Sequence, residues 1–524
     1  MTVAVFRKGA LVSLLTLAAC GPAGEEDAAF DVVETTIAGI QSAIAAGETS
    51  CRAVVEAYLA RIAAYDEVTG LNAITVINPQ ARERAGEIDA ALQTGAELGP
   101  LWCAPLLIKD NFDTRDLPTT GGSAAMTDHR PPDDAVMIAR LRAADAIVLA
   151  KTNMAEWAFS PRRTESSSFG TTANAYALDR VPAGSSGGTA SGVAASFAVA
   201  GMGTDTGNSV RGPASHLALF GIRSTIGLTS RDGIIPLVFD RDIAGPLTRT
   251  VEDGARIFNV IAGSDPADPF TAGADARRAA DYTAFLDPAG LEGARIGVLR
   301  ALVDTEDADP RITALFEAAL ADMAAAGAVI VDPVEIPDFE AHLAADSFCP
   351  RFRYDMHVYL RSLGERAPFL DVMDVLESGR YSPYVKDELE VFAQYPLDVP
   401  PERWQEPCLP YLEHPARKRY LDAVTAAMEA ADVEVLVYPS WTNPPAHLDR
   451  PEEEYKGDNS QLVAPDTGMP AASVPMGYVA GRLPAGLQIL ARRFDEPAIF
   501  RIAYAYEQAT GHRRPPPGFA ALRE

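Results

Sequence analysis

The chain has 524 residues, of which 48% are hydrophobic, and its mean hydropathy is close to zero. These values are typical of a globular protein with one large core. The formal net charge of -27 and the pI near 4.7 disfavour nucleic acid as a partner, because an acidic surface repels phosphate backbones.

The N-terminus, residues 1–19, has the pattern of a lipoprotein signal peptide. Arg7 and Lys8 precede an apolar run that is too short to span a membrane as a stable helix. The run ends in Leu-Ala-Ala-Cys20, which resembles a bacterial lipobox. We therefore expect a lipid on Cys20 as the only membrane contact, a flexible tether over 20–30, and export to the periplasmic face of the outer membrane. A plain secretory signal or an accidental hydrophobic start is the alternative.

Apolar runs and Ala-rich amphipathic stretches alternate along the rest of the chain. Residues 104–108 read as a buried strand, and a helix over 137–144 is followed by a strand over 146–150. A helix over 312–326 is likewise followed by a strand over 328–331. This alternation predicts α/β layers around a largely buried sheet. No Gly/Ser/Pro linker divides the middle, so a single large domain is expected.

Lys109 directly follows the first predicted strand and is one of only six lysines in the chain. Burial disfavours a charged ammonium and lowers its pKa, so a neutral lysine can act as a base near pH 7. The alternative is structural, with Lys109 paired to Asp110 or to another carboxylate.

Two glycine-rich segments follow. The first, Gly184-Ser185-Ser186-Gly187-Gly188, would by itself be read as a turn. The second contains Thr206-Gly207-Asn208-Ser209, whose small or turn-prone residues can direct several backbone N–H groups at one point. Such N–H groups and a hydroxyl are what nucleophilic catalysis on a carbonyl requires.

The base for such a serine is not an obvious histidine. None of the seven histidines sits in a motif, and His216, the closest to Ser209 in sequence, is predicted to start a helix. The chain has no S-x-x-K arrangement. Together with Lys109 and the two segments above, this pattern predicts serine hydrolysis without histidine.

The same segments resemble the amidase signature family, and the resemblance covers residues 33–512. It extends to Thr119–Ser123, Lys151–Glu156, Asp242–Asp253 and Thr467–Pro475.

The resemblance implies an α/β amidase signature fold, a central mixed sheet covered by helices on both faces, over residues 31–515. It implies that Ser209 attacks a carboxylic amide and that Ser185, beside a cis peptide, passes the proton to Lys109. Backbone N–H groups would form the oxyanion hole, those of Thr206, Gly207, Asn208 and Ser209. No metal or organic cofactor is implied, the expected partner is a small-molecule amide, and a homodimer is possible.

Three positions depart from the family pattern. Asn208 stands where many members have glycine, Ala183 replaces the first glycine of the serine loop, and Cys103 stands near the base strand at a position often glycine. None of them removes a catalytic group. Because backbone N–H donors survive the change at Asn208, we expect activity to persist.

The substrate pocket is less well defined by the sequence. Met154, Ser186 and Trp441 are its candidate residues, with Trp157 and Phe159 beside them, although the apolar ones would also suit a core. Residues 337–430 are rich in aromatic and charged side chains and are expected to form a variable, substrate-shaping cap or an ordinary helical cap.

Four cysteines remain beyond Cys20, namely Cys51, Cys103, Cys349 and Cys408. They allow three pairings, and the sequence does not choose among these or exclude free thiols.

Two other functions stay open at this point. One is a histidine-dependent esterase or lipase, and the other is a non-catalytic lipoprotein that keeps the fold for binding. The substrate itself is not predicted.

Overall fold

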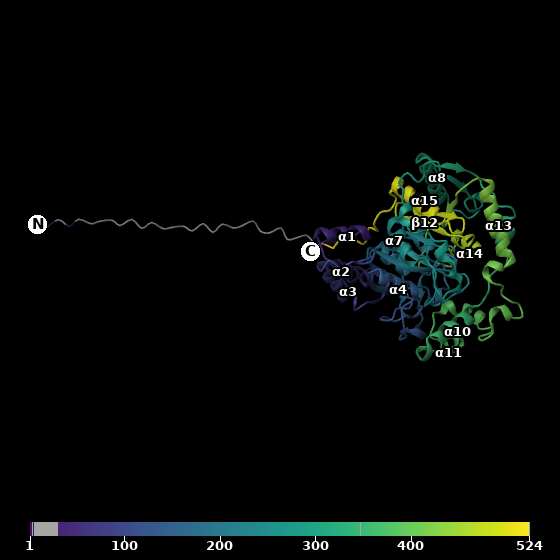
Figure 1. The fold of residues 1–524 in the computed structure, drawn as a ribbon, viewed down its shortest axis with the longest axis horizontal. Helices are drawn as coiled ribbons and strands as arrows, with labels where there is room; N and C mark the ends of the chain where they lie inside the picture. Colours follow the sequence, from purple (N-terminus) through teal and green to yellow (C-terminus); the bar gives the residue numbers. More distant parts are fainter. Residues whose placement is uncertain (3, 5–29, 346, 523–524) are drawn as a thin grey trace.

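A mixed sheet of eleven strands runs through the molecule and is flanked by helices (Figure 1). The computed structural model describes residues 1–2, 4, 30–345 and 347–522. Cys20 and the apolar run before it lie outside the described residues. The α/β class and the large mixed sheet predicted from the sequence are confirmed.

The strands of this sheet, in spatial order, are β1 (Ile74–Ile77), β3 (Ile147–Thr152), β2 (Pro105–Lys109), β6 (Ala200–Asp205), β8 (Ile243–Thr248), β7 (Phe220–Arg223), β12 (Ala471–Val479), β13 (Leu483–Ala491), β11 (Val435–Pro439), β9 (Arg295–Val298) and β10 (Val329–Val331). β2 is parallel to both β3 and β6, and β9 is parallel to β10 and β11. The remaining pairs are antiparallel. A separate two-stranded ribbon joins β4 (Glu165–Ser166) and β5 (Gly170–Thr171).

The α-helices are α1 (Ile37–Ala46), α2 (Cys51–Thr69), α3 (Ala81–Gln93), α4 (Val136–Ala143), α5 (Gly187–Ala194), α6 (Arg211–His216), α7 (Val251–Ile261), α8 (Pro310–Ala325), α9 (Phe339–Leu343), α10 (Phe352–Ser362), α11 (Val372–Ser378), α12 (Lys386–Phe392), α13 (Pro415–Ala430), α14 (Ala464–Thr467) and α15 (Glu496–Thr510).

Local sequence signals explain where these elements begin and end. The hydroxyl of Thr36 accepts the N–H of Gly39 at the start of α1, and Gly47 ends that helix in the left-handed conformation. Asp309 caps α8 ahead of Pro310, which suits the first turn because it needs no N–H donor there. The strand β2 is buried at every position, as its unbroken apolar run predicts.

The predicted elements agree with the structure to within one or two residues. The strands expected over 104–108, 146–150 and 328–331 are β2, β3 and β10, and the two expected helices are α4 and α8. One prediction is wrong, because His216 ends α6 instead of starting a helix. The helix begins earlier, at Arg211, shortly after Ser209.

The segment over 337–430 carries α9 to α13 and forms a second, smaller hydrophobic cluster with parts of the main body. Phe352 of α10 packs edge-to-face against Trp157 at a ring distance of 6.2 Å, and Phe159 lies 4.8 Å from the same Phe352 ring. In Figure 1 α10 and α11 lie at the end of the molecule away from α8 and α15. The aromatic residues of this segment are therefore packing residues in large part.

All four cysteines beyond Cys20 are paired in the structure. Cys51 is bonded to Cys103, and Cys349 is bonded to Cys408. The first bond joins α2 to the turn before β2, and the second ties the chain before α10 to the stretch before α13. Cys103 is thus a disulfide residue and not simple packing.

Candidate active site

The site forms where the parallel strands β2 and β6 end side by side. Ile108 of β2 is in register with Met202 of β6, so the two strands point the same way. The carboxyl ends of parallel strands meet at one edge of a sheet, and loops leaving that edge commonly carry function. Lys109 is the last residue of β2, and the predicted nucleophile loop leaves β6 after Asp205.

Lys109 contacts the first of the two serines predicted to act with it. Its Nζ donates to Ser185 Oγ at 2.7 Å and to Thr204 Oγ1 at 2.7 Å. Asn111 donates to the same threonine hydroxyl at 3.1 Å. Lys109 is fully buried, and no carboxylate lies within salt-bridge distance of it in the described part of the chain. The ion pair weighed as an alternative from the sequence belongs instead to Lys151 and Asp110, which are 3.6 Å apart.

Burial controls the protonation of this lysine. It lowers the pKa of Lys109 from 10.5 to about 7, while the more distant charges of Asp242 and Asp205 oppose the shift. Near neutral pH a large share of the molecules therefore carries a neutral amine at Lys109. A neutral amine can accept a proton from the hydroxyl that it contacts.

The serine loop before α5 lies against neighbouring backbone. The peptide bond between Gly184 and Ser185 is cis, as the family resemblance implied. A Cβ on Gly184 would lie 2.3 Å from the carbonyl oxygens of Ser160 and Arg163, so only glycine fits there. The Ser186 hydroxyl donates to the Thr204 carbonyl at 3.2 Å, which fastens the loop to β6.

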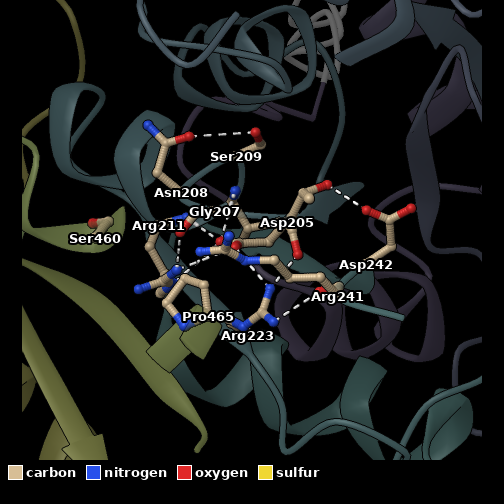
Figure 2. A network of polar contacts seen from close by, with 12 residues as sticks. Asp205, Gly207, Asn208, Ser209, Arg211, Arg223, Arg241, Asp242, Ser460 and Pro465 are labelled. Carbon is tan, nitrogen blue, oxygen red and sulfur yellow. Dashed lines mark hydrogen bonds and ion pairs between the residues drawn. The ribbon is translucent and has the colours of Figure 1, made fainter. Parts of the chain in front are cut away.

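The loop between β6 and α6, which carries Ser209, is held by buried ion pairs (Figure 2). Asp205 accepts hydrogen bonds from Arg211 and Arg223, each at 3.1 Å. Burial raises the pKa of Asp205, but the two arginines outweigh it and bring that pKa down to about 2. Arg211 also donates to the carbonyl of Gly207 at 2.5 Å, and Val210 N–H donates to Asp205 at 3.2 Å. The loop is thus fixed at both ends.

Four backbone donors of this fixed loop are unpaired. Between β6 and α6, the N–H groups of Thr206, Gly207, Asn208 and Ser209 make no hydrogen bond to any described residue. The hydroxyl of Thr206 is occupied by Asp242. Unpaired N–H groups next to a serine are the donor set that a tetrahedral oxyanion requires. The loop therefore has the composition of an oxyanion hole.

The hydroxyl of Ser209 contacts its neighbour in sequence. Among the described residues its hydrogen-bond partner is Asn208 Oδ1, at 3.3 Å (Figure 2). His216 does not contact it; this ring lies tilted against Trp441 with the ring centroids 4.4 Å apart, and burial lowers the pKa of His216 to about 3. A histidine buried in this way is not placed to act as the base for Ser209.

Ser209 opens into a pocket of about 330 Å³. Pockets of similar volume lie elsewhere on the molecule, so the chemistry and not the volume identifies this one. Its walls are mainly apolar, with two charged residues. The lining residues are Ala158, Phe159, Pro161, Thr206, Gly207, Asn208, Ser209, Leu237, Arg241, Phe348, Glu388, Phe392 and Gln461.

The pocket residues expected from the sequence lie mostly elsewhere. Phe159 lines the pocket, whereas Met154, Ser186 and Trp441 are buried and are not among its lining residues. Trp157 packs in the second hydrophobic cluster. The actual walls come from segments far apart in sequence, where single apolar residues such as Phe392 carry no motif. No sequence signal distinguishes them.

The described residues contain no group of three or more His, Cys, Asp or Glu side chains arranged to hold a metal ion.

Comparison with known proteins identifies the class. The sequence profile of the Amidase family matches residues 53–500. The chain belongs to this family, and it is an enzyme that acts on the C–N bond of amides. The binding-protein and esterase alternatives are not favoured.

Individual relatives cover most of the chain. It is 34% identical over 501 residues to a glutamyl-tRNA(Gln) amidotransferase subunit of Symbiobacterium thermophilum, covering 90% of this chain and 96% of that protein. The structure resembles peptide amidase from Stenotrophomonas maltophilia with a TM-score of 0.81 and 36% identity, over 92% of this chain and 98% of the other. A bacterial aryl acylamidase matches with a TM-score of 0.75 and 25% identity, over 91% and 96%.

The periplasmic location predicted from the pattern at Cys20 is wrong. The matching curated relatives are glutamyl-tRNA(Gln) amidotransferase subunits by name, and tRNA is an intracellular molecule, so they contradict an exported protein. A short apolar run before a cysteine is a local pattern, and the similarity over nine tenths of the chain outweighs it.

Among the described helices, none is long and apolar enough to cross a bilayer.

Proposed function

We propose that this chain hydrolyses carboxylic amides through an acyl-enzyme on Ser209, with Ser185 and Lys109 moving the proton. The contact that carries the proposal is the 2.7 Å hydrogen bond between Lys109 Nζ and Ser185 Oγ, made by a lysine whose pKa burial lowers to about 7. A buried amine of this kind is a base poised for neutral pH.

The reaction proceeds in two halves. When substrate binds, the Ser209 hydroxyl turns from Asn208 to Ser185. As the Ser209 oxygen bonds to the amide carbon, its proton passes to Ser185 and the Ser185 proton passes to Lys109. The C–N bond then breaks, and the proton on Lys109 returns through Ser185 to the leaving nitrogen. Water then attacks the ester carbon while its proton passes through Ser185 to Lys109, and that proton returns through Ser185 to Ser209 as the ester C–O bond breaks.

The reaction also requires donors for the oxyanion, and the unpaired N–H groups of the loop between β6 and α6 can supply them. In the tetrahedral intermediate the carbonyl oxygen becomes an oxyanion, and the N–H groups of the loop from Thr206 to Ser209 stabilise it. Removing one such donor typically costs about 10²–10³-fold in kcat. The buried Asp205 pairs hold these donors in place before substrate arrives, so little reorganisation is needed.

We propose that the substrate carries a bulky apolar group next to the scissile amide. Phe159, Leu237 and Phe392 give the pocket an apolar wall, and Glu388 stands exposed in its lining. The similarity to a peptide amidase agrees with this substrate class, since amino-acid and peptide amides present such side chains. The cap over 337–430, part of a domain over 31–515, contributes Phe392 and Glu388 and is the substrate-shaping element.

We further propose that the enzyme acts on small amides without nucleic acid. Its similarity to amidotransferase subunits would also fit a role beside tRNA. The net charge of -27 favours small amides alone, because a partner phosphate backbone would be repelled.

Substitution of Lys109 tests its proposed role as the base. With phenylalaninamide as substrate, Lys109→Ala should lower kcat by about 10²–10⁴-fold, the usual contribution of a general base. His216→Gln serves as the matched control and should retain kcat within about threefold. If instead Lys109→Ala hydrolyses at the wild-type rate while the histidine variant is inactive, the proposed mechanism is wrong.

A further inference from the structure

Asn208 connects the nucleophile to a distant loop. Its side chain is 1% exposed and makes three polar contacts. The amide nitrogen donates to Asp458 Oδ2 at 2.9 Å and to the carbonyl of Pro161 at 3.4 Å, and the amide oxygen accepts from Ser209 Oγ at 3.3 Å. Asp458 is 250 residues further along the chain.

The two acceptors around the amide nitrogen fix which way the amide faces. A carboxyl oxygen that accepts and a backbone carbonyl both require a donor, so the NH2 end of Asn208 must point toward Asp458 and Pro161. The oxygen end therefore faces Ser209. Without Asp458 only the 3.4 Å contact to Pro161 would oppose a flipped amide, and the flipped form would present NH2 to the serine.

Asp458 is itself held firmly. Its Oδ2 also accepts the hydroxyl of Tyr455 at 2.8 Å, and the Tyr455 ring packs edge-to-face on Trp441 at 5.5 Å. Its Oδ1 is buried without a hydrogen-bond partner among the described residues. A carboxyl group kept in this costly setting, directly behind a side chain that contacts the nucleophile, requires an explanation beyond stability.

The protonation state of Asp458 does not change the direction of its contact with Asn208. Burial raises the pKa of Asp458 to about 7, while the hydrogen bond from Tyr455 and the charge of Arg211 oppose the shift. Because Oδ2 already accepts two donors, a bound proton belongs on Oδ1. Oδ2 therefore accepts from Asn208 whether or not the carboxyl group is charged.

We propose that Asn208 is a positioning residue for Ser209: its amide oxygen holds the serine hydroxyl in one orientation between turnovers, and Asp458 keeps that oxygen turned toward the serine. The inference rests on the proposed role of Ser209 as nucleophile. Glycine, present at this position in many members of the family by resemblance, has no side chain to make the contact.

The contact is long, and this suits the role. A hydrogen bond of 3.3 Å between neutral groups is weak enough to be exchanged for Ser185 when substrate arrives. It still restricts the rotamers of Ser209 while the pocket is empty. Among the described residues, Asp458 makes no side-chain hydrogen bond to the serine or to any pocket-lining residue except Asn208, so its influence on the reaction passes through Asn208.

The test is a double-mutant cycle on the full chain. The rate of Ser209 labelling by a fluorophosphonate probe is measured together with kcat and KM for phenylalaninamide. Asn208→Ala and Asp458→Leu should each speed labelling and lower KM about fivefold with kcat unchanged, because the neutral hydrogen bond that they remove stabilises only the free enzyme. The double variant should be no faster than either single one, because Asp458 acts through Asn208.

Conservative variants separate positioning from mere packing. Asp458→Asn keeps an acceptor for both Asn208 and Tyr455 and should restore labelling to within about twofold of wild type. Glu453→Gln, an exposed carboxylate on the same loop, is the matched control. If Asp458→Leu fails to fold, Asn208→Ala and Asp458→Asn alone still decide the matter.

Three results would overturn the inference: unchanged or slower labelling of Asn208→Ala, equal increases for Asp458→Asn and Asp458→Leu, or increases that multiply in the double variant. Each of these leaves Ser209 labelled in the wild type, so the proposed function stands. A folded wild-type protein that is not labelled at Ser209 would overturn both.

Discussion

The side chain of Lys109 is fully buried, and this burial sets the pH range in which its amine is neutral. Its hydrogen-bond partners are the hydroxyls of Ser185 and Thr204, which can donate or accept and so tolerate either protonation state. A carboxylate in direct contact would have kept the lysine charged. Because no carboxylate contacts Lys109 in the described part of the chain, its amine can become neutral and act as a base.

A pH profile follows from this pKa. The active form has a neutral Lys109, so kcat/KM should rise with pH and level off above about 7. Below that value it should fall about tenfold per pH unit, because only the deprotonated fraction acts as base. Initial rates between pH 5 and 9 measure the profile. A rate that stays flat down to pH 5 would contradict a neutral lysine base.

At the residue scale, the sequence predicted Lys109, Ser185 and Ser209 because each lies in a short local segment with a recognisable pattern. The hydrogen bond between Asn208 and Asp458 could not be predicted in this way, since 250 residues separate them. A buried aspartate without a motif looks like any other acidic residue in a chain with 72 of them. Only the folded chain reveals that it faces the site.

At the scale of single elements, the loop between β6 and α6 and the helix α12 have different tasks. Buried ion pairs hold the loop, which makes it suited to chemistry. α12 belongs to the cap and presents Phe392 to the pocket, where its ring lies 5.5 Å from the ring of Phe159 on the body. We therefore expect α12 to influence which substrate fits and not how the bond is broken.

A substitution in α12 tests this division. Phe392→Ala should lower kcat/KM for phenylalaninamide about tenfold relative to acetamide, because burying an aromatic ring of the substrate against Phe392 is worth about 1.4 kcal/mol or more. The ratio of the two kcat/KM values is the measurement. Val391→Ala, on the exposed side of the same helix, is the control and should leave the ratio unchanged. Equal decreases for both amides would show that Phe392 supports the fold and not the selection of substrate.

The elements themselves were largely predictable. β2, β3 and β10 are continuous apolar runs, and such runs are a strong signal for buried strands. The order of the strands in the sheet was not predictable, because it depends on pairing between segments far apart in sequence, as between β7 and β12. The start of α6 was also missed, since its sequence, with Gly212 and Pro213, is a poor helix signal.

At the scale of the whole molecule, both ends of the described domain are fastened to its body. Glu34 near the start pairs with Arg513 near the end at 2.7 Å, and Arg513 also donates to the carbonyl of Ala218 at 2.7 Å. The two disulfides fasten α2 to the turn before β2 and link two parts of the cap. The sequence allowed three pairings, and only the distances in the folded chain select one.

The net charge of -27 is the other property of the whole chain that bears on function. The proposal that small amides are the substrates depends on it, whereas the comparison with amidotransferase subunits concerns the fold and the amide chemistry. The net charge and the similarity to amidotransferase subunits do not conflict. The site proposed to cleave the amide lies within one domain, so the chemistry does not require a nucleic-acid partner.

The central claim is that Ser209 is the nucleophile, and intact-mass analysis after exposure to a fluorophosphonate probe tests it most directly. The wild-type chain should gain the mass of a single adduct, and Ser209→Ala should gain none. Ser185→Ala should be labelled slowly, since it keeps the nucleophile and removes the path for its proton. An adduct that persists in Ser209→Ala, or a folded wild-type chain that gains no mass, would contradict the claim.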